Sequence, residues 1–234
     1  MDINRSIKFY AKSTIDKQEI IFSGFSLSDF IKCSPISLKN IMLLKSEYIG
    51  AKSLYNFELL EGEDDISDLA HNDICKYGDL CFIDYSDTSA INCLSKEQIA
   101  ELLYLAHLHE PIKSPFNETL NNNYVYLSHD NGWYCKLFCK ERMGPVTILV
   151  NKINLEIQRL KKNNCHLLHI SSDSIDEIEK FLEIGLLVEI SMHSNKELPI
   201  EVKLYQVGEY NNMDKLLNDT TIDDSQIVSK IIIN

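Results

Sequence analysis

The sequence predicts an α+β protein with antiparallel sheet elements and covering helices, and three observations support this class. Apolar and polar residues alternate in several short runs, which is typical of strands with one buried face. Other segments carry apolar residues three and four positions apart after a capping residue, as amphipathic helices do. An Asn-Gly pair between two aromatic runs predicts a hairpin, which joins neighbouring antiparallel strands.

Seven segments of the first 110 residues show these patterns. Ser95 and Gln98 form a capping box, which predicts the start of a helix that ends before Pro111. Its expected core stripe is Ile99, Leu102, Leu103 and Ala106. The expected elements are strands over 6–10 and 20–22, helices over 28–33 and 37–45, strands over 53–61 and 80–85, and the helix from Ser95.

The second half continues with the hairpin and a long helix. Gly144-Pro145 is a typical helix start, and the apolar residues after it follow helical spacing. Gly185 is expected to end a later helix. The expected elements are strands over 124–128 and 133–140, a helix from Gly144, a strand over 166–170, a helix over 175–184, and strands over 186–192 and 200–207.

The length of 234 residues fits two small lobes or one large domain. The segment 111–123 is a long, proline- and asparagine-containing connection, which favours a boundary there. The two-lobe interpretation has an N-terminal α+β lobe over 1–110 with the acidic segment. Its C-terminal lobe over 111–234 holds the aromatic hairpin and a strand-helix-strand unit. The alternative is a single domain over 1–234.

Acidic charge is concentrated in the middle of the chain. The formal net charge is −12, and residues 61–130 hold 14 Asp and Glu against 3 Lys and Arg. Nucleic-acid affinity depends largely on Lys and Arg that replace counterions, so direct binding to DNA or RNA is disfavoured. A basic protein would be attracted instead, with a salt-sensitive association rate.

Several features indicate a cytoplasmic protein. No apolar run approaches the roughly 18 residues that a membrane helix needs, so no membrane partner is expected. The first residues lack the apolar core of a secretory signal. Seven cysteines are an odd number in a chain long enough to build its own core, which indicates free thiols in a reducing compartment.

Metal and cofactor sites are not expected. Cys135 and Cys139 lie four apart on an expected strand, about 13 Å from each other, which is too far to share one zinc ion. The same distance separates Cys165 from His169. The glycine-rich loops that hold nucleotides and the elbow that carries a nucleophilic serine are missing from the sequence.

An enzyme is the alternative interpretation. A thiolate site could be assembled from distant segments, with Cys81 or Cys93 as nucleophile and His107 or His129 as base. Paired carboxylates between 61 and 87 offer acid–base chemistry, although a helix N-terminus explains residues 63–65 more simply. Such an enzyme would be a hydrolase or a transferase.

The preferred hypothesis is a non-enzymatic binding or inhibitory protein, as a toxin-neutralising protein would be. Its surface would combine acidic residues with aromatic ones, which are enriched at binding hot spots, and would select a basic protein partner. Ordinary cross-strand packing of the aromatic rings is the simpler interpretation of the hairpin. The expected surface comprises Glu63, Asp64, Asp65, Asp68, Asp73, Tyr124, Tyr126 and Trp133.

Overall fold

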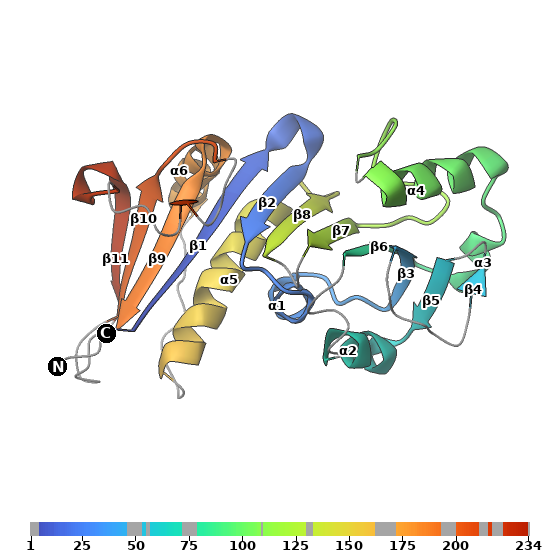
Figure 1. Ribbon diagram of the computed structural model, residues 1–234, viewed down its shortest axis with the longest axis horizontal. Helices are drawn as coiled ribbons and strands as arrows, with labels where there is room; N and C mark the ends of the chain where they lie inside the picture. Colours follow the sequence, from blue (N-terminus) through green and yellow to red (C-terminus); the bar gives the residue numbers. More distant parts are fainter. Residues whose placement is uncertain are drawn as a thin grey trace.

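One antiparallel sheet forms the frame of the protein. The computed structural model describes residues 5–45, 53–54, 57–71, 79–108, 110–129, 133–161, 172–192, 200–210, 215–216 and 222–233. The strands are β1 (Arg5–Thr14), β2 (Glu19–Ser23), β3 (Asn40–Lys45), β4 (Ser53–Leu54), β5 (Phe57–Glu61), β6 (Leu80–Asp84), β7 (Tyr124–His129), β8 (Tyr134–Cys139), β9 (Leu186–Met192), β10 (Ile200–Gln206) and β11 (Ile227–Ile233). Their order across the sheet is β11-β10-β9-β1-β2-β8-β7-β6-β3-β5-β4 (Figure 1).

Helices lie on both faces of this sheet. They are α1 (Leu27–Cys33), α2 (Glu63–His71), α3 (Thr88–Ile91), α4 (Lys96–Leu108), α5 (Gly144–Lys161) and α6 (Ser172–Ile184), with short 3-10 turns η1 (Ile15–Lys17) and η4 (Asp224–Gln226). α1, α2, α5 and α6 share the larger apolar cluster on one face, and α3 and α4 share a second cluster on the other. The α+β class with antiparallel strands is therefore confirmed.

The helix expected over 37–45 is wrong, because this segment contains β3. Ile41 and Leu43 belong to the larger cluster, whereas Met42 and Leu44 belong to the second cluster on the opposite face. A strand between two covered faces is apolar at every position, so its sequence loses the alternation that identifies strands. The same residues then also satisfy helical spacing, which explains the error.

The hairpin and the capped helix agree with the sequence. β7 pairs with β8 from Tyr124 opposite Cys139 to His129 opposite Tyr134. The Ser95 hydroxyl accepts a hydrogen bond from the Gln98 backbone N–H, and the Gln98 side chain accepts one from the Ser95 N–H. The expected core stripe of α4 is wrong at one position: Leu103 is 46% exposed, whereas Leu102, Leu105 and Ala106 are buried.

The junction between α6 and β9 requires a glycine. Gly185 has a φ angle of +118°, which side-chain-bearing residues rarely adopt. A Cβ atom there would lie 2.2 Å from the Gly208 carbonyl oxygen and 2.7 Å from the Tyr10 hydroxyl. Gly185 therefore ends α6, as the sequence predicts, and also allows the segment after β10 to approach the start of β9.

The sheet is continuous across the expected lobe boundary. β1 pairs with β9 on one side and with β2 on the other, so residues 5–11 lie beside residues 186–192. The division into two lobes stays a prediction.

The strand expected over 166–170 lies outside the described residues, and β11 was not expected at all. In the described part of the chain, no helix is both long and apolar enough to cross a membrane.

Candidate functional site

His129 is the catalytic candidate that the fold places beside another titratable group. It ends β7, and its Nδ1 atom lies 2.5 Å from Oδ1 of Asp79, which directly precedes β6. Both side chains are partly exposed, at 40% and 36%. A carboxylate that accepts the Nδ1–H of an imidazole orients the ring and leaves Nε2 as its basic atom. Sequence reasoning missed Asp79, which is 50 residues away and becomes a neighbour through the pairing of β6 with β7.

The other catalytic candidates lie in different environments. Cys81 is fully buried within β6, among the apolar residues that α4 covers. A buried thiol in apolar surroundings is a poor nucleophile because the thiolate form is disfavoured there. His107 is exposed near the end of α4, and Cys93 is exposed after α3. The described residues contain no group of three or more His, Cys, Asp or Glu side chains placed to hold a metal ion.

The acidic residues of the expected binding surface are accessible. Glu63, Asp64, Asp65 and Asp68 are exposed on α2, whose inner side buries Ile66 and Leu69. The Ser37 hydroxyl donates a hydrogen bond of 2.6 Å to Glu63. No ion pair joins Asp64, Asp65 or Asp68 to another residue that the structure describes. Asp73 lies outside the described residues.

Two of the three aromatic residues expected on this surface are buried. Tyr124 and Tyr126 are 3% and 0% exposed and contact the Phe30 ring, with ring centroids 5.2 and 5.4 Å away. The Tyr126 hydroxyl donates to the Phe25 carbonyl oxygen at 3.1 Å. These two rings therefore pack in the core instead of facing a partner, because α1 covers this side of the hairpin. Trp133 is 40% exposed.

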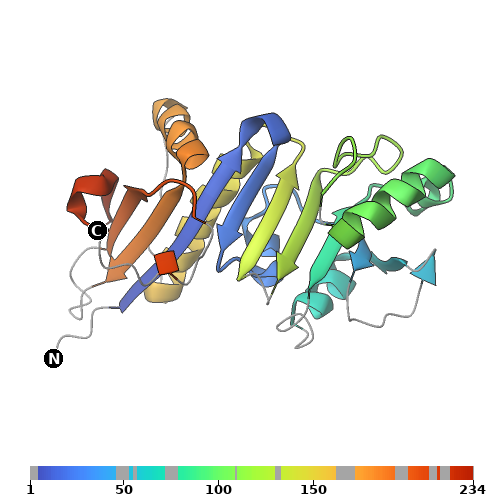
Figure 2. The same cartoon turned by 45° about the horizontal axis from the view of Figure 1, so that its top comes forward.

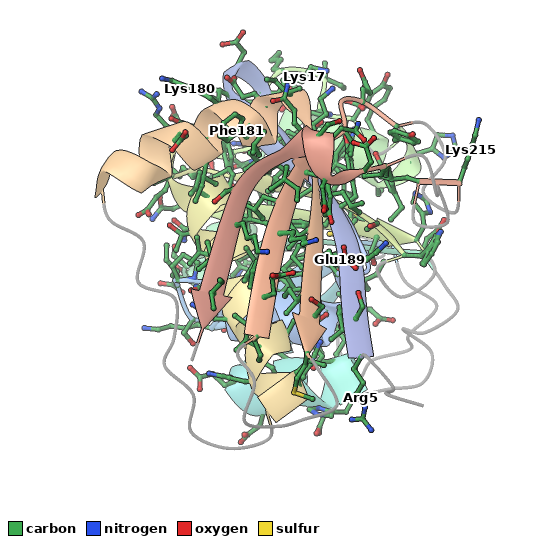
Figure 3. The ribbon with its side chains drawn as sticks, turned by 90° about the vertical axis from the view of Figure 1, so that its left-hand side faces the viewer. Arg5, Lys17, Lys180, Phe181, Glu189 and Lys215 are labelled. Carbon is green, nitrogen blue, oxygen red and sulfur yellow. The ribbon has the colours of Figure 1, made fainter. Side chains whose placement is uncertain are left out.

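Several charges on the strands at the other end of the sheet are paired. Lys230 Nζ lies 2.6 Å from Glu201, and Lys203 Nζ lies 3.1 Å from Asp224. Glu189 accepts hydrogen bonds from Ser6 and Tyr205 on the flanking strands (Figure 3). Opposite charges on neighbouring strands stabilise their pairing, so these side chains have a structural role.

A buried ionic network joins α1 to α5, and the sequence interpretation did not include it. The Lys152 ammonium group lies 2.7 Å from Asp29 and 2.5 Å from Glu156, and all three side chains are buried. Arg159 bonds both carboxylates, at 2.6 Å to Glu156 and through Nη2 to Asp29. A signal was present: Lys152 and Glu156 interrupt the apolar side of α5 with opposite charges four residues apart.

The positive charges in this network stabilise the ionised form of Asp29. Burial acts to raise the pKa of Asp29, but the hydrogen bonds and positive charges of Arg159 and Lys152 outweigh it and lower that pKa. Asp84, a buried carboxylate at the end of β6, has a pKa raised by burial. It accepts hydrogen bonds from the backbone N–H groups of Asn123 and Tyr124, which positions the start of β7. Both carboxylates are thus explained by the fold.

The lowered pKa of Asp29 predicts a loss of stability in acid. A carboxyl whose pKa is lower in the folded state stabilises the fold above its unfolded pKa, about 3.9, and the contribution disappears as the pH falls through the folded value. The difference in unfolding free energy between wild type and Asp29→Asn should therefore shrink between pH 6 and pH 3. Urea titrations at both pH values measure it, and a constant difference would contradict the role of the Asp29 charge.

Two hollows in the described part of the surface are small. One of about 20 Å³ is bordered by Glu19, Arg142 and Glu179, and one of about 40 Å³ lies between α4 and residues 111–117. Sites for drug-sized ligands are typically about 300 Å³ or more, whereas hollows of this size hold single water molecules. Neither hollow is large enough to enclose an organic substrate.

Comparison with known proteins found no match to this chain among protein-family models, curated proteins or solved structures.

Proposed function

We propose that this chain is a non-enzymatic binding or inhibitory protein of the cytoplasm, which engages a basic protein partner through the acidic end of its sheet. The acidic end comprises the described residues of 57–123, which form β5, α2, β6, α3 and α4. Toxin neutralisation is one example of such a role. The observation that carries the proposal is the segregation of charge along the sheet.

Some surface carboxylates are paired within the fold, whereas others have no described ion-pair partner. Glu201 and Asp224, near the β11 edge, are balanced by lysines. At the acidic end, Glu101 pairs with Lys113 and Glu110 pairs with Lys136, but the carboxylates of α2 have no described ion-pair partner. Uncompensated carboxylates gathered at one end produce a directional field, which accelerates association with a basic protein.

A second candidate function is hydrolysis or group transfer, and the His129–Asp79 pair favours it. Orientation of an imidazole by a carboxylate is a recurring part of general-base sites. Cys81 is not an accessible nucleophile, so such an enzyme would use water, a substrate hydroxyl or the exposed Cys93. The partly exposed position of both side chains makes this the weaker candidate.

Charge reversal on α2 tests the binding function. Asp65→Lys together with Asp68→Lys should weaken capture of a basic protein by at least tenfold, because the variant replaces two attractive charges with two repulsive ones. Immobilised wild type and variant are incubated with cell lysate in low salt, and the captured proteins are quantified by mass spectrometry. Capture should decline as the salt concentration rises.

The matched control is Glu177→Lys with Glu183→Lys on α6, where both side chains are exposed and the change in net charge is the same. This control should retain the partner. Lysozyme, an unrelated basic protein, is added in parallel to measure nonspecific attraction. The binding function is contradicted if no basic protein is enriched over lysozyme, or if both double variants lose it equally.

A further inference from the structure

α4 has apolar residues on two opposite sides, although only one side packs on the sheet. Its inner side buries Leu102, Leu105 and Ala106. Its outer side carries Ala100, Leu103, Tyr104 and His107, which are all exposed and follow the spacing i, i+3, i+4, i+7. Residues with this spacing form one stripe along a helix, so α4 has a second, outward stripe of mostly apolar character. We name these four residues the outer stripe.

The outer stripe is unusual for a helix at the surface of a monomer. A surface helix normally has polar residues opposite its buried side, and a helix with apolar residues all round is usually covered on both sides. Leu103 is 46% exposed and Tyr104 is 42% exposed, and Ile112, in the segment after α4, is 53% exposed. Figure 2 shows α4 at the outside of the molecule.

Carboxylates flank the outer stripe. Glu97 and Glu101 lie along one side of it, because each is separated by three or seven residues from Tyr104. Asp87, Glu110 and Glu118 are further exposed carboxylates at the same end of the sheet. Lys96 at the N-terminal end of α4 and Lys113, which pairs with Glu101, only partly offset this acidic charge.

This charge decides between the two occupants that could cover an apolar helix face. A second copy of the chain would place the acidic end of one molecule against the acidic end of the other, which is unfavourable. A helix with an apolar side and flanking Lys or Arg residues would bury the outer stripe and also neutralise its acidic border. The partner that complements both features is therefore basic and amphipathic.

We propose that the outer stripe of α4 is the docking surface for a basic amphipathic helix of the protein partner. This inference rests on the proposed function and deepens it, since it specifies where the partner docks and which structure it presents. The stripe from Ala100 to His107 is about 10 Å long, two helical turns, which suits side-by-side packing of two helices. Leu103 and Tyr104 are the central anchors, because aromatic and large apolar side chains dominate binding energy when they become buried.

The test uses two synthetic peptides of equal charge and the full-length protein. The first is an 18-residue peptide of leucine and lysine with helical periodicity, and the second has lysine at the same positions and serine in place of leucine. Fluorescence anisotropy measures the affinity of each labelled peptide. The amphipathic peptide should bind wild type at least tenfold more tightly than the serine peptide, and Leu103→Ser with Tyr104→Ser should remove that advantage.

Ile184→Ser with Ile232→Ser is the matched control, because these side chains are 44% and 58% exposed on α6 and β11. It should change the affinity less than twofold, and thermal melting confirms that both double variants fold. Equal binding of the two peptides, or an unchanged affinity after the α4 substitutions, would overturn the proposal. Sedimentation is run alongside, and a dimer that dissociates in the α4 variant would assign the stripe to a second copy instead.

The results separate the docking surface from the proposed function. Asp65→Lys with Asp68→Lys tests capture of a basic protein, and the two peptides test the outer stripe. If capture depends on the α2 carboxylates but the α4 substitutions leave the peptide affinities unchanged, the binding function stands and the docking surface is wrong. If α4 binds the amphipathic peptide but no basic protein is captured, the docking surface stands and the proposed partner class is wrong.

Discussion

Replacement of Lys152 by methionine is expected to lower the free energy of unfolding by about 3–5 kcal/mol, the range observed when one partner of a buried ion pair is removed. Lys152 is 2% exposed and lies between two buried carboxylates, Asp29 and Glu156. Without its ammonium group, only Arg159 would compensate both negative charges. The Lys152 ammonium also lies 5.6 and 5.8 Å from the ring centroids of Phe9 and Phe25, an attraction that methionine lacks.

Urea unfolding followed by circular dichroism measures this loss. Lys180→Met on α6 is the matched control, because Lys180 is exposed and its replacement should change stability by no more than about 0.5 kcal/mol (Figure 3). The triple variant Asp29→Leu, Lys152→Met, Glu156→Leu should recover most of the loss, since apolar residues of similar volume can replace a buried ionic group. A loss below about 1 kcal/mol for Lys152→Met would contradict a tightly coupled network.

Phe30→Ala should also destabilise the protein by about 3–5 kcal/mol, as removal of a fully buried aromatic side chain does. Phe30 is 0% exposed on α1, and its ring contacts Phe25, Phe82, Tyr124 and Tyr126, with centroid distances of 5.2 to 6.3 Å. The substitution would leave a cavity where α1 joins β6 and β7. These contacts also carry aromatic pair energies beyond the area that they bury.

The matched control for Phe30→Ala is Trp133→Ala, an aromatic truncation at a position that is 40% exposed. Its expected cost is smaller because solvent fills the space that the side chain leaves. Thermal unfolding of both variants, read by near-UV and far-UV circular dichroism, provides the comparison. Equal losses for the two variants would show that Phe30 is not the centre of the aromatic cluster.

Local patterns predicted those elements that carry a signal in neighbouring residues. β9 has one apolar side, α6 ends at a glycine with a positive φ angle, and the hairpin of β7 and β8 follows an Asn-Gly signal. β3 failed because both of its sides are covered. β11 was overlooked because its strand-forming residues follow a polar segment, and its place beside β10 depends on a pairing that the sequence does not show.

The candidate site residues also divide into those that local sequence could assign and those that only the folded sheet brings together. The exposed carboxylates of α2 could be assigned from their positions before and along an amphipathic helix. Asp79 could not be assigned to His129, because β6 and β7 come together only in the folded sheet. Tyr124 and Tyr126 were expected at the surface, but α1 packs over them. Leu103 was expected in the core, but it lies on the outer side of α4.

The sequence by itself determined the α+β class, the hairpin and the location of the excess acidic charge along the chain, because these depend on neighbouring residues and on composition. The tertiary structure alone decided which of those groups are covered. It buried Lys152 between carboxylates of two helices, and it left the acidic α2 and the outer stripe of α4 at the surface. The physical reason is that burial depends on contacts between segments far apart in the chain, which local patterns do not contain.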